Sequence, residues 1–301
     1  MNSVDAWRER LWPLGVWCPT DGLPAARAVE LVQRIEALGY STIWLPDTMG
    51  RDPFAHIAFL AERAHPLIFA TGIASIHHRH PGAMRQAAAT LAEQSEGRFV
   101  LGLGVSHAPF VEGVRGLDYS RPLTTMRTYL EAMDTAPYMA PEPAIRAPRL
   151  LAALGPKMLE LAGEKADGAH PYWTTPEHTQ RAREILGPDK LVCVEQKVVL
   201  TDDADVARRT ARAALDLYAG LPNYRNNWLR LGFADKDIDA KADSFIDALV
   251  AWGDAPAIRA RVGEHVQAGA DHVCIQPMSP DQPFQVDEAA LAALAPREVA
   301  D

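Results

Sequence analysis

Two titratable side chains, Asp47 and His107, stand just after apolar segments that have the composition of buried strands. Asp47 follows Thr42–Pro46 (TIWLP), and His107 comes shortly after Arg98–Gly104 (RFVLGLG). Histidine titrates near neutrality and is the usual general acid or base, and a carboxylate can serve the same purpose. Ligand chemistry gathers at the carboxyl ends of parallel strands. Both residues are therefore candidate catalytic groups, with a solvated loop histidine as the alternative for His107.

A possible phosphate site begins at Gly155-Pro156, where a predicted helix follows the apolar segment Leu150–Leu154. A helix start presents unpaired N–H groups and a partial positive charge, and Lys157 adds a formal charge nearby. Barrel proteins often bind phosphate at a late strand-to-helix loop of this kind. An ordinary turn between a strand and a helix is the alternative interpretation.

A histidine cluster, His77, His78 and His80, resembles a metal site at first sight. Adjacent residues of an extended segment point to opposite faces, so His77 and His78 would not share an ion. No Cys, Asp or Glu lies beside them to complete a ligand set. His80 with Pro81 is more typical of the turn that enters a helix, and we predict no metal.

Glycines and polar residues at other predicted strand ends extend the candidate site. Gly102 and Gly104 lack the third glycine of a dinucleotide fingerprint and lie inside a strand, so they are a very weak nucleotide signal. With Gly72, they could instead let a flat ring approach the backbone, or they could simply be packing glycines. His170 and Trp173 end a sixth strand and are candidates comparable with Asp47.

The segments that must position these residues alternate between strand and helix. The predicted strands are Leu14–Cys18, Thr42–Pro46, Leu67–Ala74, Arg98–Gly104, Leu150–Leu154, Gly168–Tyr172, Leu191–Leu200 and Asp271–Gln276. The predicted helices include Leu23–Leu38, Pro53–Ala64, one opened by Pro81, Leu123–Met133, Pro156–Lys165, one from about Thr175, Asp203–Ala219 and Pro256–Ala268. Eight alternations favour an α/β fold of the (β/α)8 TIM-barrel type over an open doubly wound sheet.

The remaining sequence predicts insertions within a single domain, residues 1–301. We place them at about 107–148, after strand four, and 220–255, in the connection of strands seven and eight. Ala136–Pro148 contains four prolines and cannot form regular structure. Residues 220–255 are predicted to be helical. No Gly/Ser-rich linker divides the chain.

Composition excludes several classes of function. A formal charge of −9 without basic runs argues against a nucleic-acid surface. The first residues have no long apolar region typical of a signal peptide, and no apolar run approaches about 18 residues, so no membrane span is expected. Cys18, Cys193 and Cys274 lie apart among apolar neighbours and are predicted to be buried thiols. We expect a cytoplasmic globular protein.

An ordered set of segments resembles the bacterial luciferase-like monooxygenases. The segments are WLPD (44–47), ATGIAS (70–75), HPGAMRQAAATLAEQSEGRFVLGLG (80–104), AALGPKMLELAGEKADGAHPY (152–172) and AGADHVCIQ (268–276). Within the superfamily, the chain is most similar to the actinobacterial branch assigned as coenzyme F420-dependent oxidoreductases. The resemblance spans nearly the whole chain and is less specific for the cofactor, because enzymes that use FMN share these motifs.

The resemblance implies a (β/α)8 barrel with a flavin or deazaflavin ring over the carboxyl ends of the strands. In the family, a bulge in strand three, often with a non-prolyl cis peptide, presses against the ring, and the matching step is Gly72-Ile73. A homodimer is a further expectation. The cofactor residues implied are Asp47, Gly72, Ile73, Ser75, Val105 and Ser106 at the ring, and Gly155, Pro156, Lys157 and Met158 at the phosphate, with His170 and Tyr172 from the end of strand six.

Two departures from the family concern proton transfer. The F420-dependent sugar-phosphate dehydrogenases carry a His after the strand-two Asp, where this chain has Thr48, and a Glu where it has His107. Oxidation of a sugar phosphate is therefore disfavoured, and His107 becomes the foremost acid or base candidate.

Three functions remain open from the sequence. The leading hypothesis is hydride transfer between F420 and a small organic substrate. The alternatives are an FMN-dependent monooxygenase and a flavin-binding protein without turnover. Several aromatic residues could build an apolar substrate pocket above the ring or could belong to the core: Trp17, Phe110, Tyr138, Tyr172 and Trp173.

Overall fold

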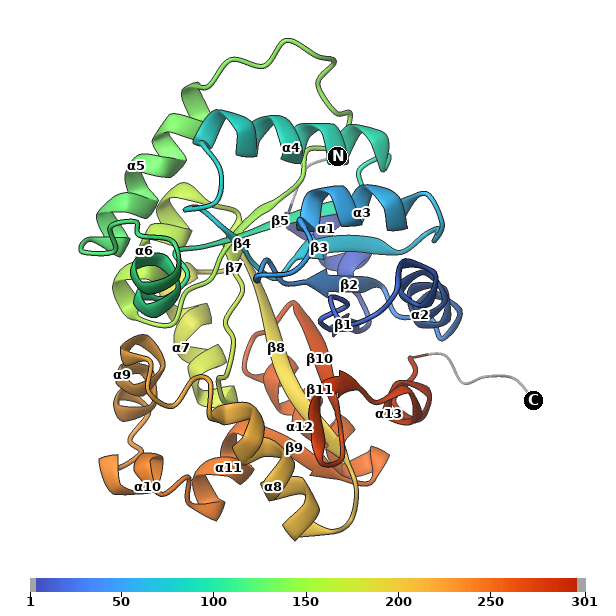
Figure 1. Ribbon diagram of the computed structural model, residues 1–301, viewed down its shortest axis with the longest axis vertical. Coiled ribbons are helices and arrows are strands. Elements are labelled where there is room, and N and C mark those ends of the chain that lie inside the picture. Colours follow the sequence, from blue (N-terminus) through green and yellow to red (C-terminus); the bar gives the residue numbers. More distant parts are fainter. Residues whose placement is uncertain (1–3, 297–301) are drawn as a thin grey trace.

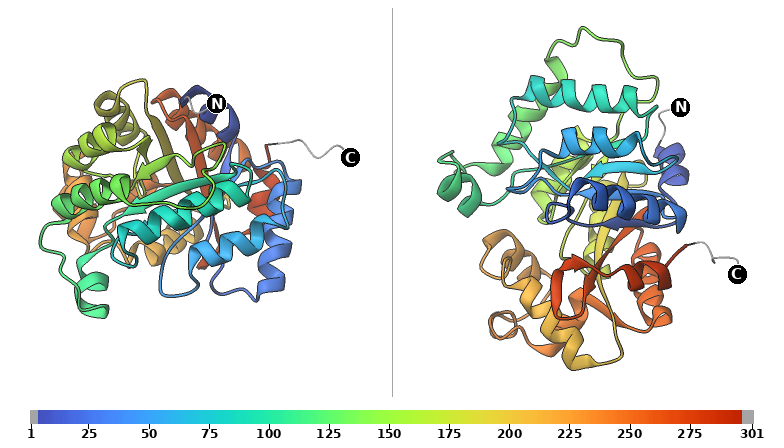
Figure 2. Two further views of the ribbon diagram at one scale, coloured as in Figure 1. Left: turned by 90° about the horizontal axis from the view of Figure 1, so that it is seen from above. Right: turned by 45° about the vertical axis from the view of Figure 1, so that its right-hand side comes forward.

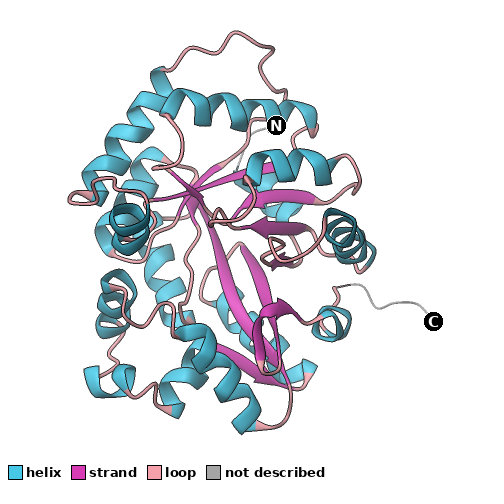
Figure 3. Ribbon diagram, viewed as in Figure 1, coloured by secondary structure: helices cyan, strands magenta, loops and turns pink. Residues whose placement is uncertain are grey.

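Eight parallel strands close into a barrel, and helices surround them (Figure 1, Figure 3). The computed structural model describes residues 4–296, so the outermost residues of the predicted domain, 1–3 and 297–301, lie outside the described part. β10 pairs with both β1 and β8 and thereby closes the barrel, which confirms the predicted fold. The strands follow the order β1 (Gly15–Trp17), β2 (Thr42–Leu45), β3 (Ile68–Thr71), β5 (Phe99–Gly104), β6 (Arg149–Leu151), β7 (Gly168–Ala169), β8 (Leu191–Leu200) and β10 (His272–Ser279).

The helices that cover the barrel begin where the sequence provides a proline or a capping aspartate. Asp52, Asp203 and Asp254 each accept a backbone N–H at a helix start, as N-caps do. No helix within residues 4–296 is both long and apolar enough to cross a bilayer. The covering helices are α2 (Ala25–Ala37), α3 (Pro53–Ala61), α4 (Pro81–Gln94), α5 (Pro122–Thr135), α6 (Pro156–Lys165), α7 (Pro176–Leu186), α8 (Ala204–Leu215) and α12 (Ala255–Gln267).

Further elements decorate this framework. A π-helix, η1 (Pro109–Val114), follows β5, and β4 (Ala74–Ser75) continues the line of β3 by pairing with β5. Figure 2 shows the helices α9–α11 gathered near one end of β8, away from α2 and α3. The other additions are α1 (Val4–Leu11), α9 (Pro222–Arg230), α10 (Asp235–Asp239), α11 (Asp243–Leu249), β11 (Gln282–Val286), which is antiparallel to β10, and α13 (Glu288–Ala293).

One predicted element is wrong. The second insertion was expected to be helical to its end, but Val250–Gly253 forms strand β9. β9 pairs with the carboxyl end of β8, from Lys197 to Leu200. Four apolar residues are too few to show a helical or strand period, so the pairing partner decides the conformation.

A layer of buried apolar and neutral polar side chains fills the barrel interior. Trp44 stacks on His170, with ring centroids 4.2 Å apart, and donates to Thr42 and His272. Burial lowers the pKa of His272 to about 3, so its ring is neutral at ordinary pH. Trp7 from α1 belongs to the same cluster and supports it from the amino-terminal end. The three cysteines are free and buried, which confirms their predicted state.

Candidate functional site

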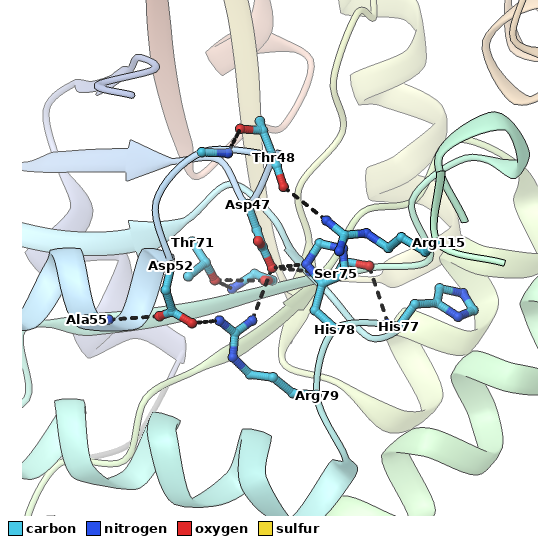
Figure 4. Close-up of polar contacts among 12 residues, drawn as sticks. Asp47, Thr48, Asp52, Ala55, Thr71, Ser75, His77, His78, Arg79 and Arg115 are labelled. Atoms are coloured by element: carbon cyan, nitrogen blue, oxygen red, sulfur yellow. Dashed lines mark hydrogen bonds and ion pairs between the residues drawn. The ribbon is translucent and has the colours of Figure 1, made fainter. Parts of the chain in front are cut away.

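Asp47 ties the end of β2 to the loop that follows β4 (Figure 4). Its Oδ2 accepts hydrogen bonds from the Ser75 amide at 3.1 Å, from His78 Nδ1 at 2.9 Å and from Arg79 Nη1 at 3.2 Å. Only 6% of the Asp47 side chain is exposed. The carboxylate is therefore held by three donors and acts chiefly to fix the loop and to orient His78.

The same loop separates the histidines that resembled a metal site. His78 turns toward Asp47 (Figure 4), whereas the His77 ring lies 6.1 Å from that of Tyr119. Within residues 4–296, no three His, Cys, Asp or Glu side chains gather as metal ligands. Arg79 also pairs with Asp52, the N-cap of α3, so the loop is anchored on two carboxylates.

Strand three is interrupted at Gly72-Ile73, between β3 and β4, and the bond between these residues is cis, at the step where the resemblance places the family's bulge. Trp17 Nε1 donates to Gly72 O at 2.8 Å, and a Cβ on Gly72 would lie 2.7 Å from that nitrogen. A Cβ on Gly104 would lie 2.4 Å from Ile73 Cδ1. Glycine at both positions allows the close approach that brings Ile73 to the carboxyl end of the barrel.

The segment after β5 places His107 against the second insertion. Its ring centroid lies 5.5 Å from that of Tyr224 in α9 and 6.3 Å from that of Phe110 in η1. Burial lowers the pKa of His107 below its ordinary value, and a side-chain contact with Asn223 opposes this only in part. A neutral imidazole can accept a proton, which is the property required of a base.

Four aromatic side chains form a wall beside His107, namely Trp17, Tyr172, Tyr218 and Tyr224. Tyr172, after β7, lies with its ring centroid 5.2 Å from Trp17 and 5.6 Å from Tyr218, and Tyr218 lies 5.2 Å from Tyr224. The Tyr172 hydroxyl donates to Gln276 Oε1 at 2.9 Å. Tyr138 is the exception among the predicted aromatic residues. It lies between α5 and β6, in a helix-to-strand loop at the opposite end of the barrel.

Cationic side chains meet at the start of α6, where Gly155 is the N-cap. A Cβ on Gly155 would lie 3.3 Å from Arg230 Nη2, so the guanidinium at the end of α9 lies over this helix start. Arg181 donates to the Arg230 carbonyl at 2.6 Å, and Lys157 is exposed in the first turn. None of these three cations forms an ion pair with a carboxylate in the described part of the chain.

Buried polar atoms lie in the loop between β7 and α7. Thr174 Oγ1 and Trp173 Nε1 are buried and make no hydrogen bond to any residue in 4–296. Buried polar atoms are seldom left unpaired, so such donors commonly mark a place where a ligand or water completes the bonding. Together with the cations at α6, they fit a phosphorylated flat cofactor.

His170 and Tyr172, the two cofactor residues predicted at the end of strand six, lie in different surroundings. Tyr172 is partly exposed in the aromatic wall, whereas His170 is 1% exposed and lies in the barrel interior. Its Nδ1 hydrogen bonds with Cys193 O at 2.9 Å, and burial lowers its pKa to about 4. The structure does not bring His170 to the surface of the site, and its contact is with Trp44 instead.

Sequence reasoning missed an ion pair, Glu195 and Lys197, at the centre of β8. Both side chains are 1% exposed, and Lys197 lies against the rings of Tyr172 and Trp173. The signal was present as two opposite charges two residues apart in LVCVEQKVVL, where Gln196 is the one other polar residue. Residues two apart in a strand share a face, so the pair could have been placed on one side of the strand.

Comparison with known proteins identifies the family. A family model described as luciferase-like monooxygenase matches residues 12–272. The chain belongs to the luciferase-like monooxygenase family. It is an enzyme of the oxidoreductase type that this family contains.

Individual relatives of this luciferase-like chain carry related names. It is 25% identical to a protein of Mycobacterium tuberculosis named as a coenzyme F420-dependent oxidoreductase, over 89% of this chain and 95% of that one. It is also 25% identical to the 5,10-methylenetetrahydromethanopterin reductase of Methanolobus tindarius, over 86% and 85% of the two chains.

Solved structures share its fold. An F420-dependent secondary alcohol dehydrogenase in complex with an F420-acetone adduct matches with a TM-score of 0.71 and 16% identity, over 98% of each chain. The FMN complex of the oxygenating component of 3,6-diketocamphane monooxygenase from Pseudomonas putida matches with a TM-score of 0.68 and 15% identity, over 94% and 98%. Both likenesses concern the barrel architecture.

Proposed function

We propose that this protein is an F420-dependent oxidoreductase that moves a hydride between the deazaflavin and a small organic substrate. The observation that carries the proposal is the cationic start of α6, where Arg230 lies over Gly155 without a carboxylate partner in the described residues. In this acidic protein, cations without carboxylate partners among the described residues lie at a helix N-terminus, and such a place can bind a phosphate. The name of one relative, which this chain matches over 95% of that relative's length, supports F420 as the cofactor.

The residues divide into two groups around this cofactor. The ring would bind against the Gly72-Ile73 step, and the phosphate would bind at α6 beside Arg230. When bound, the deazaflavin supplies the hydride acceptor or donor. The ring residues are Asp47, Gly72, Ile73, Ser75, Val105, Ser106 and Tyr172, and the phosphate residues are Gly155, Pro156, Lys157 and Met158.

His107 is the proposed acid or base for the substrate. Oxidation of an alcohol to a carbonyl removes a hydride from carbon and a proton from oxygen, and the neutral His107 imidazole would take that proton. In the reverse direction, the imidazolium would return it. Asp47 is assigned a different role, because its carboxylate already holds Ser75, His78 and Arg79. It positions the ring-binding loop.

The first experiment is a fluorescence titration of the purified protein with F420, followed by FMN. We expect saturable F420 binding, and we expect Arg230→Ala to weaken it by about tenfold to a hundredfold, the range for loss of a charge-assisted hydrogen bond. Arg209→Ala, which removes an exposed charge on α8, is the control and should leave the affinity unchanged. Protein that holds FMN and ignores F420 would exclude this function.

An FMN-dependent monooxygenase is the second candidate. A 30% identity to 4-hydroxyprotoasukamycin monooxygenase of Streptomyces nodosus, over 44% of this chain and 36% of that one, supports the monooxygenase part of this candidate. Oxygen consumption with supplied reduced FMN and an apolar substrate would support this function. Cofactor binding without turnover by any electron donor would instead indicate the third alternative, a flavin-binding protein.

A further inference from the structure

The buried pair Glu195 and Lys197 has no role in the function proposed above. Lys197 Nζ lies 3.0 Å from both carboxylate oxygens of Glu195, and both side chains are 1% exposed. Removing two charges from water is costly for each ion, and apolar residues of similar volume are often as stable. Strand β8 therefore gains little stability from this pair. Its position suggests a role in the site.

The positive end of the pair faces the aromatic wall. Lys197 Nζ lies 3.5 Å from the ring centroid of Tyr172 and 3.9 Å from that of Trp173, which are cation–π distances. The Glu195 carboxylate bonds the same loop, since its Oε2 accepts the Trp173 amide at 3.4 Å. The pair therefore holds both residues of the loop after β7 and presents its cation to their rings.

The aromatic wall connects the cation to the ring-binding step. Tyr172 packs against Trp17, with centroids 5.2 Å apart, and Trp17 Nε1 donates to Gly72 O at 2.8 Å. Tyr172 thus lies between Lys197 and the residues proposed to hold the cofactor ring. A buried charge acts across one aromatic ring more strongly than it would in water, and the Glu195 carboxylate compensates part of the Lys197 charge.

We propose that Lys197, held by Glu195, stabilises negative charge on a cofactor ring bound at the Gly72-Ile73 step, and that the pair positions Tyr172 as the wall of that site. This inference rests on the proposed function, because it concerns the same cofactor. It adds a property of binding, namely that the site favours an anionic ring. Lys197 acts through Tyr172 and is a positioning residue.

The charged and titratable groups around Lys197 favour its protonated, positively charged form at neutral pH. Burial lowers the pKa of Lys197 to about 8, and the Glu195 carboxylate opposes the fall. The other titratable groups that face it are Tyr172, whose pKa burial raises well above its ordinary value, Cys274 on β10, and His170. Tyr218 and Tyr224 face Glu195 rather than Lys197. None of these groups supplies a second positive charge at neutral pH.

The test uses the full chain and oxidised F420, whose ring hydroxyl changes the visible absorption when it ionises. The midpoint of that ionisation is measured by absorbance against pH for free F420 and for F420 bound to the wild-type protein. We expect the bound ring to ionise at a lower pH than the free ring. A bound midpoint at or above the free value would overturn the inference without any variant.

Variants then assign the effect to the pair. Glu195→Gln with Lys197→Met removes both charges together, which avoids leaving one buried charge unpaired. We expect the bound midpoint to rise by about half a pH unit or more, as for loss of a partly compensated nearby charge. Lys236→Met, an exposed lysine on α10, is the matched control and should keep the wild-type midpoint.

The outcomes separate the two proposals. Tight binding with equal midpoints in wild type and the double variant would overturn the role of Lys197 and leave the proposed function intact. Absence of F420 binding by the wild-type protein would overturn the proposed function and this inference with it.

Discussion

His107 and Asp47 show how two polar residues that follow barrel strands, β5 and β2, come to differ. Asp47 receives three donors on one oxygen, whereas His107 lies among the rings of Phe110 and Tyr224 and has a lowered pKa. The first arrangement fixes a loop, and the second leaves a titratable group beside an aromatic wall. We therefore propose His107, and not Asp47, as the group that transfers the proton.

Removal of the imidazole should slow the chemical step. We expect His107→Ala to lower kcat for F420-linked turnover by about a hundredfold to ten-thousandfold, the usual contribution of a general acid or base. Because the pKa of His107 is lowered, alcohol oxidation by the wild type should hold its rate to a pH below 6.5 before it declines. Steady-state kinetics across pH measure both effects.

His80→Asn is the control for this variant, because Asn keeps the acceptor that His80 offers to Gly82 N at the start of α4. A His107→Ala enzyme with the wild-type kcat and pH profile would contradict the assignment.

At the scale of elements, the contact between β3 and β5 depends on Gly102. Thr71 Oγ1 donates to Gly102 O at 2.8 Å and accepts from Gly102 N at 2.9 Å. A Cβ on Gly102 would lie 2.1 Å from the Thr71 carbonyl oxygen, which is backbone and cannot rotate away. The strands can approach this closely only without a side chain at this position.

We expect Gly102→Ala to lower the free energy of unfolding by about 1–3 kcal/mol, the cost of overpacking a rigid contact. Denaturant unfolding measures the loss. Gly113→Ala is the matched control, since a Cβ there would meet nothing within 4 Å, and its free energy of unfolding should change by about 0.5 kcal/mol or less. Equal stability of the two variants would show that β3 and β5 adjust freely.

The elements also show which parts of the structure the sequence could predict. Pro156–Lys165 and Leu191–Leu200 have the predicted bounds, because a helix-starting proline and a long apolar run are strong local signals. Strand β9 could not be predicted, since its partner is the distant end of β8. The cis step at Gly72-Ile73 came only from the family resemblance. Arg230 could not be assigned, because only the folded chain brings α9 to α6.

At the scale of the whole molecule, buried neutral histidines make stability depend on pH. Burial lowers the pKa of His170 and His178 to about 4 and that of His265 and His272 to about 3. In the unfolded chain each would titrate near 6.5. Between these values the unfolded state binds more protons than the folded state, so the free energy of unfolding falls as the pH drops below 6.5.

Each histidine should contribute about 1.4 kcal/mol per pH unit within that window. We expect thermal unfolding at pH 7 and above to be insensitive to these groups, and Tm to fall steeply from about pH 6.5 downward. His265→Gln, which removes a ring that hydrogen bonds with Thr179 and Gln196, should reduce the slope. A slope that stays at the wild-type value would assign the acid sensitivity to other groups.

A homodimer and a cytoplasmic location stay predictions of the sequence.

Helix α9 with its two capping residues, 221–231, connects two parts of the proposed site. It contributes Tyr224 beside His107 at one end and Arg230 over Gly155 at the other. One short stretch of chain therefore touches both the proposed substrate wall and the proposed phosphate site. We therefore expect an exchange of this stretch for that of a relative to change both proposed sites in one step.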